Sequence, residues 1–221
     1  MKKVIYRVWL LLPEFLRLPI DIIRRCPKWK NEGVLFIHVP KAAGYSVSMA
    51  IYGRALGHFY AKDVKRFCPN TFSDAFTFGV VRHPVDRLYS AYCFAKSGGT
   101  DVMGMRKPEQ YSTAAFDSFE SFVCEWLANQ DLAQIDGVFR PQHFYLCDSG
   151  KIIVDEVFRL EEIDAGVEKL SAVLCREILI EHHNQSVEKN KIDISTETLS
   201  IIEQCYKKDF EIFGYRFGGN K

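Results

Sequence analysis

A short apolar run, residues 34–39, leads directly into a lysine and then into a loop of small residues. Such a run, bounded by a glycine and a proline, is typical of a buried parallel strand, and residues 44–56 have the pattern of a helix. The first N–H groups of a helix lack intrahelical partners, and the helix dipole favours negative charge there. The stretch therefore predicts an anion-binding loop, with Lys41 adding a positive charge and Gly44 allowing close approach of the main chain.

The same order of strand and helix recurs further along the chain. Residues 75–81 predict a second strand and residues 85–95 a second helix, with Pro84 in a first turn that tolerates it. Two such units in succession imply an α/β fold with a parallel sheet and right-handed crossovers. The remaining expected elements are a loop at 97–112, helices at 116–128, 161–174 and 196–213, and strands at 152–158 and 178–181.

Length, charge and cysteine content limit the alternatives. The 221 residues are most economically one domain, residues 31–221, preceded by an amphipathic and basic helical segment, residues 1–30. The formal charge of +1 gives no overall attraction to nucleic acid, so we expect no nucleic-acid partner. Seven scattered cysteines without a C-x-x-C pair argue against a disulfide framework and against a zinc site. We therefore expect free cysteines, no metal and a cytoplasmic protein.

The N-terminal segment leaves two alternatives open. Charged residues and Pro13 interrupt its apolar run well short of the roughly 20 residues that a spanning helix needs, and no small-residue cleavage site follows. The preferred interpretation is a helix packed on the domain. The alternative is an amphipathic helix lying on a membrane, where nearby basic residues attract anionic lipid. In that case the protein is peripheral to the inner membrane.

The second predicted strand ends in another candidate anion site. Arg82 follows it directly and can fork onto a phosphate, and Ser90 lies on the following helix within reach of the same group. Ligands of open parallel sheets bind at the carboxyl ends of the strands, so both loops are expected to face one site. The first loop is not a Walker A motif, because Lys41 precedes Gly44 and no hydroxyl residue follows the lysine to hold magnesium.

Together these segments resemble sulfotransferases that use 3′-phosphoadenosine 5′-phosphosulfate (PAPS), most closely the Golgi-type carbohydrate sulfotransferase superfamily and its bacterial relatives. In that family the first loop has the pattern His-[Val/Ile]-Pro-Lys-Thr-[Ala/Gly]-Gly-Thr-Ser, and the second Arg-x-Pro-x-x-Arg-x-x-Ser-x-Tyr. The second pattern is complete here as Arg82, Pro84, Arg87, Ser90 and Tyr92. Residues 142–146, 151–161, 184–186 and 206–215 look like further landmarks of the family.

The resemblance implies a P-loop-like, three-layer α/β/α fold and transfer of a sulfuryl group from PAPS to a hydroxyl of a carbohydrate or glycolipid, which releases adenosine 3′,5′-bisphosphate. The first loop departs from the family pattern, because Ala42 and Tyr45 replace two threonines. Backbone N–H donors survive both changes, so we expect the cofactor site to persist. The cofactor-binding residues implied are Lys41, Ala42, Ala43, Gly44, Tyr45, Ser46, Arg82, Ser90, Asn184 and Ser186.

For catalysis, the resemblance implies that Lys41 neutralises the charge that develops on the bridging oxygen of the leaving nucleotide. As the base we favour His58, which follows the first helix where related carbohydrate enzymes place an acceptor-facing histidine; an exposed loop histidine is the competing interpretation. His143 is the second candidate, and His143 and Arg159 are candidate acceptor contacts. His38, inside the first strand, is interpreted as a structural histidine.

Two other functions stay open on the sequence. A small-molecule or nucleotide kinase also uses a phosphate-binding loop between strand and helix. A non-catalytic, glycan-binding relative is the other alternative, because the altered loop residues Ala42 and Tyr45 are compatible with loss of turnover.

Overall fold

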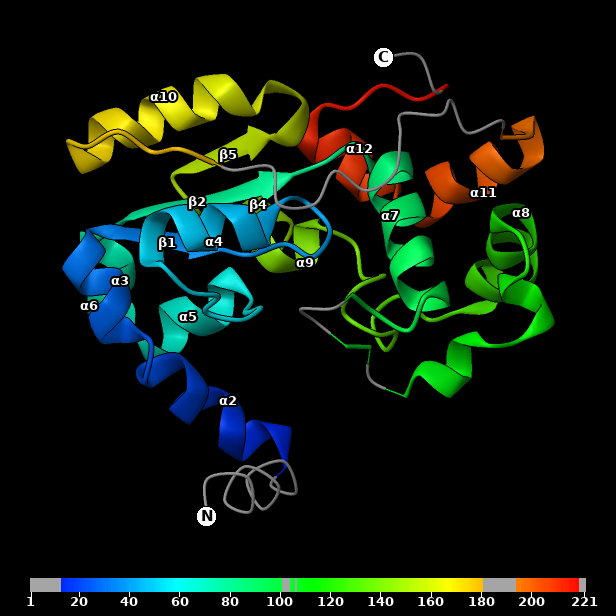
Figure 1. Ribbon diagram of the computed structural model, residues 1–221, viewed down its shortest axis with the longest axis horizontal. Helices are drawn as coiled ribbons and strands as arrows, with labels where there is room; N and C mark the ends of the chain where they lie inside the picture. Colours follow the sequence, from blue (N-terminus) through cyan, green and yellow to red (C-terminus); the bar gives the residue numbers. More distant parts are fainter. Residues whose placement is uncertain (1–12, 101–103, 106, 181–193, 219–221) are drawn as a thin grey trace.

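The centre of the computed structural model is a parallel sheet of three strands in the order β1-β2-β5 (Figure 1). The model describes residues 13–100, 104–105, 107–180 and 194–218. Helices flank the sheet, so the predicted α/β fold with a central parallel sheet is confirmed. In register, Phe36 lies opposite Phe78, and Val80 lies opposite Phe158. The strands are β1 (Val34–Ile37), β2 (Phe76–Val81) and β5 (Glu156–Arg159).

The helices that position the site follow the strands directly. The other helices precede β1 in the chain, lie between the strands or follow α10. No described helix is long and apolar enough to cross a membrane. The helices after β1, β2 and β5 are α4 (Gly44–Tyr52), α7 (Pro84–Lys96) and α10 (Ile163–Leu174). The remaining ones are α2 (Glu14–Ile23), α3 (Cys26–Glu32), α5 (Ala61–Phe67), α6 (Pro69–Asp74), α8 (Phe119–Ser121), α9 (His143–Leu146), α11 (Thr196–Cys205) and α12 (Lys207–Phe213).

Strand β1 lies at the edge of the sheet, and Tyr52 at the end of α4 pairs its free side. The Tyr52 hydroxyl accepts a hydrogen bond from the Phe36 N–H at 2.9 Å and donates one to the Val34 carbonyl at 3.1 Å. An unpaired edge strand would otherwise expose these groups. All four β1 residues are buried, which explains the uninterrupted apolar run in the sequence.

A second apolar cluster, rich in aromatic rings, forms where α7 meets the segment 111–139 and the C-terminal helices. Its packing changes the predicted helix 116–128, which is broken into short pieces: a 3₁₀ turn, α8, a π turn at Phe122–Trp126 and a further 3₁₀ turn. The rings of Phe116, Phe122 and Trp126 contact one another in this cluster, with centroids 5.0–5.3 Å apart. Packing of the rings has therefore overridden helical regularity.

Two other predicted elements are also interrupted. The expected strand 152–158 is split, because β4 (Lys151–Ile152) pairs with β3 (Cys147–Asp148) in an antiparallel hairpin and β5 alone joins the main sheet. The expected helix 196–213 divides into α11 and α12 at Tyr206. Residues 178–180 form no strand, and the remainder of that predicted strand lies outside the described residues.

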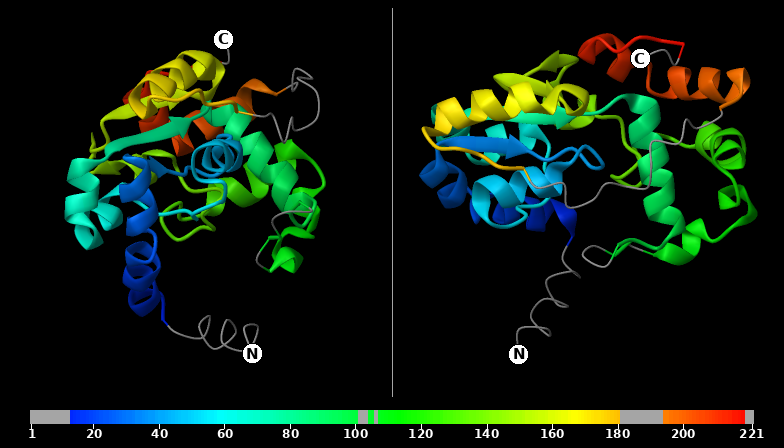
Figure 2. Two further views of the ribbon diagram at one scale, coloured as in Figure 1. Left: turned by 60° about the vertical axis from the view of Figure 1, so that its left-hand side comes forward. Right: turned by 45° about the horizontal axis from the view of Figure 1, so that its top comes forward.

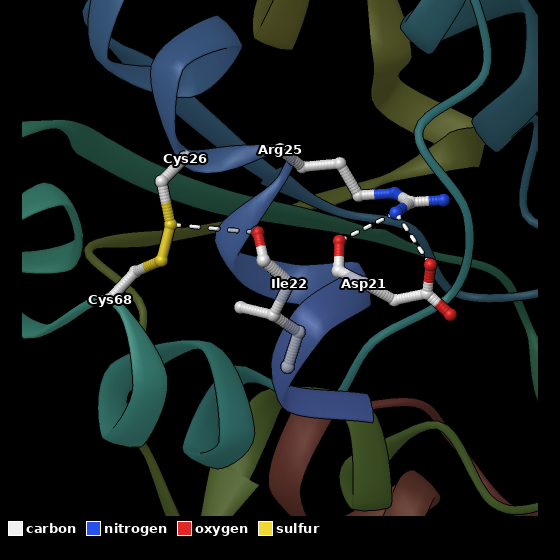
Figure 3. The surroundings of a disulfide bond; sticks show 5 residues. All are labelled: Asp21, Ile22, Arg25, Cys26 and Cys68. Carbon is white, nitrogen blue, oxygen red and sulfur yellow. Dashed lines mark hydrogen bonds and ion pairs between the residues drawn. A yellow bond between two sulfur atoms is a disulfide. The ribbon is translucent and has the colours of Figure 1, made fainter. Parts of the chain in front are cut away.

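Cys26 and Cys68 form a disulfide, which the sequence did not predict (Figure 3). It joins the start of α3 to the turn between α5 and α6, with the two Cα atoms 6.5 Å apart across 42 residues of sequence. The expectation of free cysteines is wrong for this pair, because helix packing brings together two cysteines that no local spacing relates. The other five, Cys93, Cys124, Cys147, Cys175 and Cys205, are free.

Candidate active site

A cavity of about 360 Å³ opens at the carboxyl ends of β1 and β2. The loop after β1 and the residue that follows β2 line it, together with α7 and the segment 136–138. Both predicted anion-binding segments thus face the same space, as the parallel sheet requires. The predicted site residues that line the cavity are Lys41, Ala43, Gly44, Tyr45, Ser46, His58, Arg82 and Ser90.

The loop between β1 and α4 has an unusual backbone. Lys41 and Ala43 have φ angles of 65° and 57°, in the left-handed region that side chains other than glycine rarely adopt. Ala43 is the N-cap of α4, and the residues of the first turn, Gly44, Tyr45 and Ser46, line the cavity, so the unpaired N–H groups of the helix start lie at its wall. Ala42 is fully buried in the apolar core and is not among the cavity-lining residues.

Gly44 is required by its contact with the His38 ring. A Cβ atom at position 44 would lie 1.8 Å from His38 Cδ2, far inside contact distance. The His38 ring in turn lies beside the His58 ring, with centroids 4.0 Å apart, and is stacked on Phe36 at 5.7 Å. The sequence predicted that Gly44 allows the main chain to approach a phosphate. In the structure, Gly44 makes room for the imidazole of His38, which lines the cavity.

Two cations lie together in the cavity. Burial, and secondly the positive charge of Arg82, lower the pKa of Lys41 from its usual value. The Lys41 ammonium lies 4.4 Å from the centre of the Phe94 ring. Within the described part of the chain, neither cation forms an ion pair with a carboxylate. A bound anion would relieve their repulsion, which is the electrostatic signature of a phosphate or sulfate site.

The backbone of Arg82 is held by Gln142 on the chain segment before α9. The Gln142 side chain accepts a hydrogen bond from Arg82 N at 2.9 Å and donates one to the Arg82 carbonyl at 2.8 Å. Gln142 is itself fixed by Asp209, a fully buried carboxylate that accepts from Gln142 N at 2.7 Å. This chain of contacts positions Arg82 without using its guanidinium group, which leaves that group for a ligand.

His58 is oriented by the main chain of His38. Its Nδ1 lies 3.1 Å from the His38 carbonyl oxygen, which can only accept, so Nδ1 holds the ring proton and Nε2 is the basic atom. His58 is exposed where it lines the cavity, but the protein atoms packed around it desolvate its charged form and lower its pKa, while this hydrogen bond and then Asp136 raise it. Burial, and then His58, lower the pKa of His38 well below its usual value. Both rings are therefore neutral at pH 7.

The remaining predicted residues lie elsewhere. His143 is buried against Asp209, with Nδ1 at 2.7 Å from its carboxylate, and is not among the cavity-lining residues. Arg159 donates to the carbonyls of Phe213 and Gly214, at 2.7 and 3.1 Å, and it does not line the cavity either. These contacts fit structural roles. Asn184 and Ser186 lie outside the described residues.

Sequence reasoning missed part of the cavity wall. Asp136, Val138 and Tyr145 line it, as does His38, whose buried Nδ1 has no partner within the described residues. The Asp-Gly pair at 136–137 is a turn signal, but a turn signal does not say which site the turn faces. The sequence also does not indicate that Gln142 holds the backbone of Arg82, although Gln142 lies in a segment that resembles the family.

The fold and the cavity define an α/β protein in which Lys41 and Arg82 line one cavity at the carboxyl ends of the strands. A family model described as "Sulfotransferase family" matches residues 29–216, which is most of the chain. The chain therefore belongs to the sulfotransferase family, whose sulfuryl donor is PAPS, and the resemblance noted in the sequence is confirmed. This membership favours sulfuryl transfer over the kinase alternative. No curated protein and no solved structure matched the chain.

Proposed function

We propose that the protein transfers the sulfuryl group of PAPS to a hydroxyl of a carbohydrate or glycolipid acceptor. The main support is one observation: Lys41, Arg82 and Ser90 line a single cavity together with the neutral imidazole of His58. An anion site alone would suit many nucleotides. An anion site beside a histidine that can accept a proton suits transfer to a hydroxyl group.

The residues present fit the donor. The cavity offers two cations, the hydroxyls of Ser46 and Ser90, and the N–H groups at the start of α4. By the family pattern, Lys41 and Ser46 would hold the 5′-phosphosulfate, and Arg82 and Ser90 the 3′-phosphate. When bound, the donor supplies an activated sulfuryl group whose leaving nucleotide takes up negative charge.

In the transfer step, the bond between sulfur and the acceptor oxygen forms while the bond between sulfur and the bridging oxygen of the donor breaks. Lys41 balances the charge that develops on that bridging oxygen, and His58 Nε2 receives the proton from the acceptor hydroxyl. A sulfuryl group has less negative charge than a phosphoryl group. A lysine and backbone N–H donors therefore suffice to balance it in this proposal.

The proposal is tested by mass analysis of a panel of polysaccharides and glycolipids incubated with the protein and labelled PAPS. We expect transfer of one labelled sulfate group, and calorimetric binding of adenosine 3′,5′-bisphosphate in EDTA. Magnesium-dependent binding of ATP in place of this binding would instead support a kinase. Binding of a glycan without any transfer at saturating PAPS would support the non-catalytic relative.

The lowered pKa of His58 predicts the pH dependence of transfer. Because desolvation lowers its pKa, the ring stays neutral and basic at pH values where an ordinary histidine is protonated. The acid limb of kcat/KM should therefore lie below about pH 6.5, and the rate should fall as the pH decreases through that limb. A limb at or above this value, measured with the free enzyme, would contradict the assignment of His58 as the base.

We also propose that α2 contacts a membrane surface peripherally. The helix extends away from the sheet in Figure 1 and in the left view of Figure 2, and it exposes Phe15, Leu16, Ile20 and Ile23. These residues share one side of the helix, and Arg24 is exposed beside them. An apolar stripe beside a basic residue is complementary to anionic lipid, which supports the interfacial alternative for this segment.

Vesicle sedimentation tests this contact. The protein should bind vesicles that contain phosphatidylglycerol more strongly than vesicles of phosphatidylcholine alone, and the variant I20E/I23E should lose most of this binding. I152E, a change at an exposed isoleucine on β4, is the control. Equal binding by the two variants would rule out α2 as the contact.

The cytoplasmic location remains a prediction, and the cysteines make it testable. The Cys26–Cys68 disulfide is typical of an oxidising compartment, whereas the scattered cysteines suggested a reducing one. Alkylation of thiols in intact cells, followed by mass analysis, should find both cysteines modified if the protein is cytoplasmic. Protection of the pair would place it in an oxidising compartment.

A further inference from the structure

Part of the cavity wall, Asp136, Gly137 and Val138, belongs to a segment, residues 136–139, that several side chains hold in place. Three successive backbone carbonyls of this segment each accept a hydrogen bond from a different buried side chain. The side chains come from α7, α9 and the junction of α11 with α12, so three elements fix one short loop. The pairs are Tyr145 with Gly137 at 2.8 Å, Arg87 with Val138 at 3.0 Å, and Tyr206 with Phe139 at 2.7 Å.

This segment presents one carboxylate to the cavity. Asp136 is half-buried and lines the cavity together with His58. One of its oxygens accepts a hydrogen bond from Val138 N at 3.1 Å, which keeps the side chain in place. A carboxylate has about four acceptor positions, so this bond leaves capacity for hydroxyl donors. A loop secured at three carbonyls thus holds a hydrogen-bond acceptor beside the proposed base.

The positive and negative side chains of the cavity come from different segments of the chain. Among the described lining residues, the lysine, arginine and acidic side chains are Lys41, Arg82 and Asp136, and both histidines are neutral. The two cations belong to the donor end by the family pattern. Asp136 is not among the groups that shift the pKa of Lys41, whereas its charge acts on His58 and, after burial, on Tyr111, whose pKa rises to about 12.

A second hollow on the protein adjoins the cavity at Asp136. Asp136 forms part of both, and in the hollow it is joined by Lys107, Gln110 and Tyr111. Lys107 is exposed there and does not line the cavity itself. The outer units of a long acceptor would therefore meet Lys107, whereas the carboxylate near the unit beside His58 is that of Asp136.

We propose that Asp136 binds the acceptor: its carboxylate accepts a hydrogen bond from a hydroxyl of the reacting sugar and selects a reacting unit without negative charge. The inference rests on the proposed sulfuryl transfer. A uronate or an already sulfated unit would bring a second anion next to Asp136 in a partly buried site, where like charges repel more strongly than in water. A neutral sugar offers hydroxyl donors without that repulsion.

The test compares Asp136→Asn with the wild type on matched methyl glycosides, galactoside against galacturonide and glucoside against glucuronide. The wild type should prefer the neutral member of each pair. The variant should lose roughly 10-fold or more in kcat/KM on the neutral glycosides, through the acceptor KM, and should discriminate less between members. Its KM for PAPS should not change. The matched control Asp131→Asn removes an exposed carboxylate outside the cavity and should change neither parameter.

Binding measurements separate this inference from the transfer reaction. Calorimetric titration of the same glycosides into protein saturated with adenosine 3′,5′-bisphosphate needs no turnover. Weaker binding of the neutral glycosides to the Asp136 variant supports the inference even if no transfer is detected. Unchanged acceptor binding and unchanged preference in that variant, or equal use of uronides by the wild type, would overturn it while leaving sulfuryl transfer untouched.

Discussion

Replacing Lys41 with alanine should abolish sulfuryl transfer while leaving the fold intact. Lys41 is the cation of the lysine loop, and the proposed reaction needs positive charge where the bridging oxygen of the donor becomes negative. Loss of a single preorganised group of this kind typically lowers kcat by about 10²–10³. We expect at least this loss, measured as labelled sulfate transferred from PAPS at saturating acceptor.

The stability of this variant should not fall with its activity. Burial and Arg82 both disfavour the charged form of Lys41, so removing the ammonium group removes an unfavourable interaction from the folded protein. The melting temperature should stay the same or rise. Lys208→Ala, which changes an exposed lysine on α12, is the matched control and should keep full activity. Full activity of the Lys41 variant would contradict the proposed mechanism.

The parts of the fold that the sequence predicted are those determined locally. The apolar run of β1, the proline in the first turn of α7 and the two loops at strand ends depend on neighbours in the chain, and each lies where expected. The meeting of Lys41 with Arg82 also followed, because parallel strands bring their carboxyl ends to one edge. Local pattern and sheet geometry together were therefore sufficient to predict that Lys41 and Arg82 line one cavity.

The cavity wall around Asp136, where we propose that the acceptor binds, could not be predicted because it depends on distant contacts. Asp136 faces the cavity only because buried side chains from three other elements hold the loop that bears it. Arg82 is positioned through Gln142 by Asp209, which is more than a hundred residues away in the sequence. No pattern in either segment indicates these pairings. The disulfide and the broken helix at 116–128 have the same origin, since tertiary packing decided both.

Gly44→Ala should disable the lysine loop and destabilise the protein. Where space is available, alanine in a helix is more stable than glycine by roughly 0.5–1 kcal/mol, so the sign of the effect is informative. Here the new Cβ would lie 1.8 Å from the His38 ring, which must move. Overpacking of this kind costs about 1–3 kcal/mol and sometimes more. We expect a lower free energy of unfolding in urea and loss of adenosine 3′,5′-bisphosphate binding.

A second change distinguishes this collision from other causes. If the His38 ring is the obstacle, His38→Ala in the Gly44→Ala background should recover stability relative to Gly44→Ala alone, because the added methyl group then occupies vacated space. The two changes should be strongly non-additive, with a coupling energy on the order of 1 kcal/mol or more. Gly104→Ala is the stability control, since a Cβ there has nothing within 4 Å. Additive effects would mean that Gly44 is needed for the conformation of the loop and not for the imidazole beneath it.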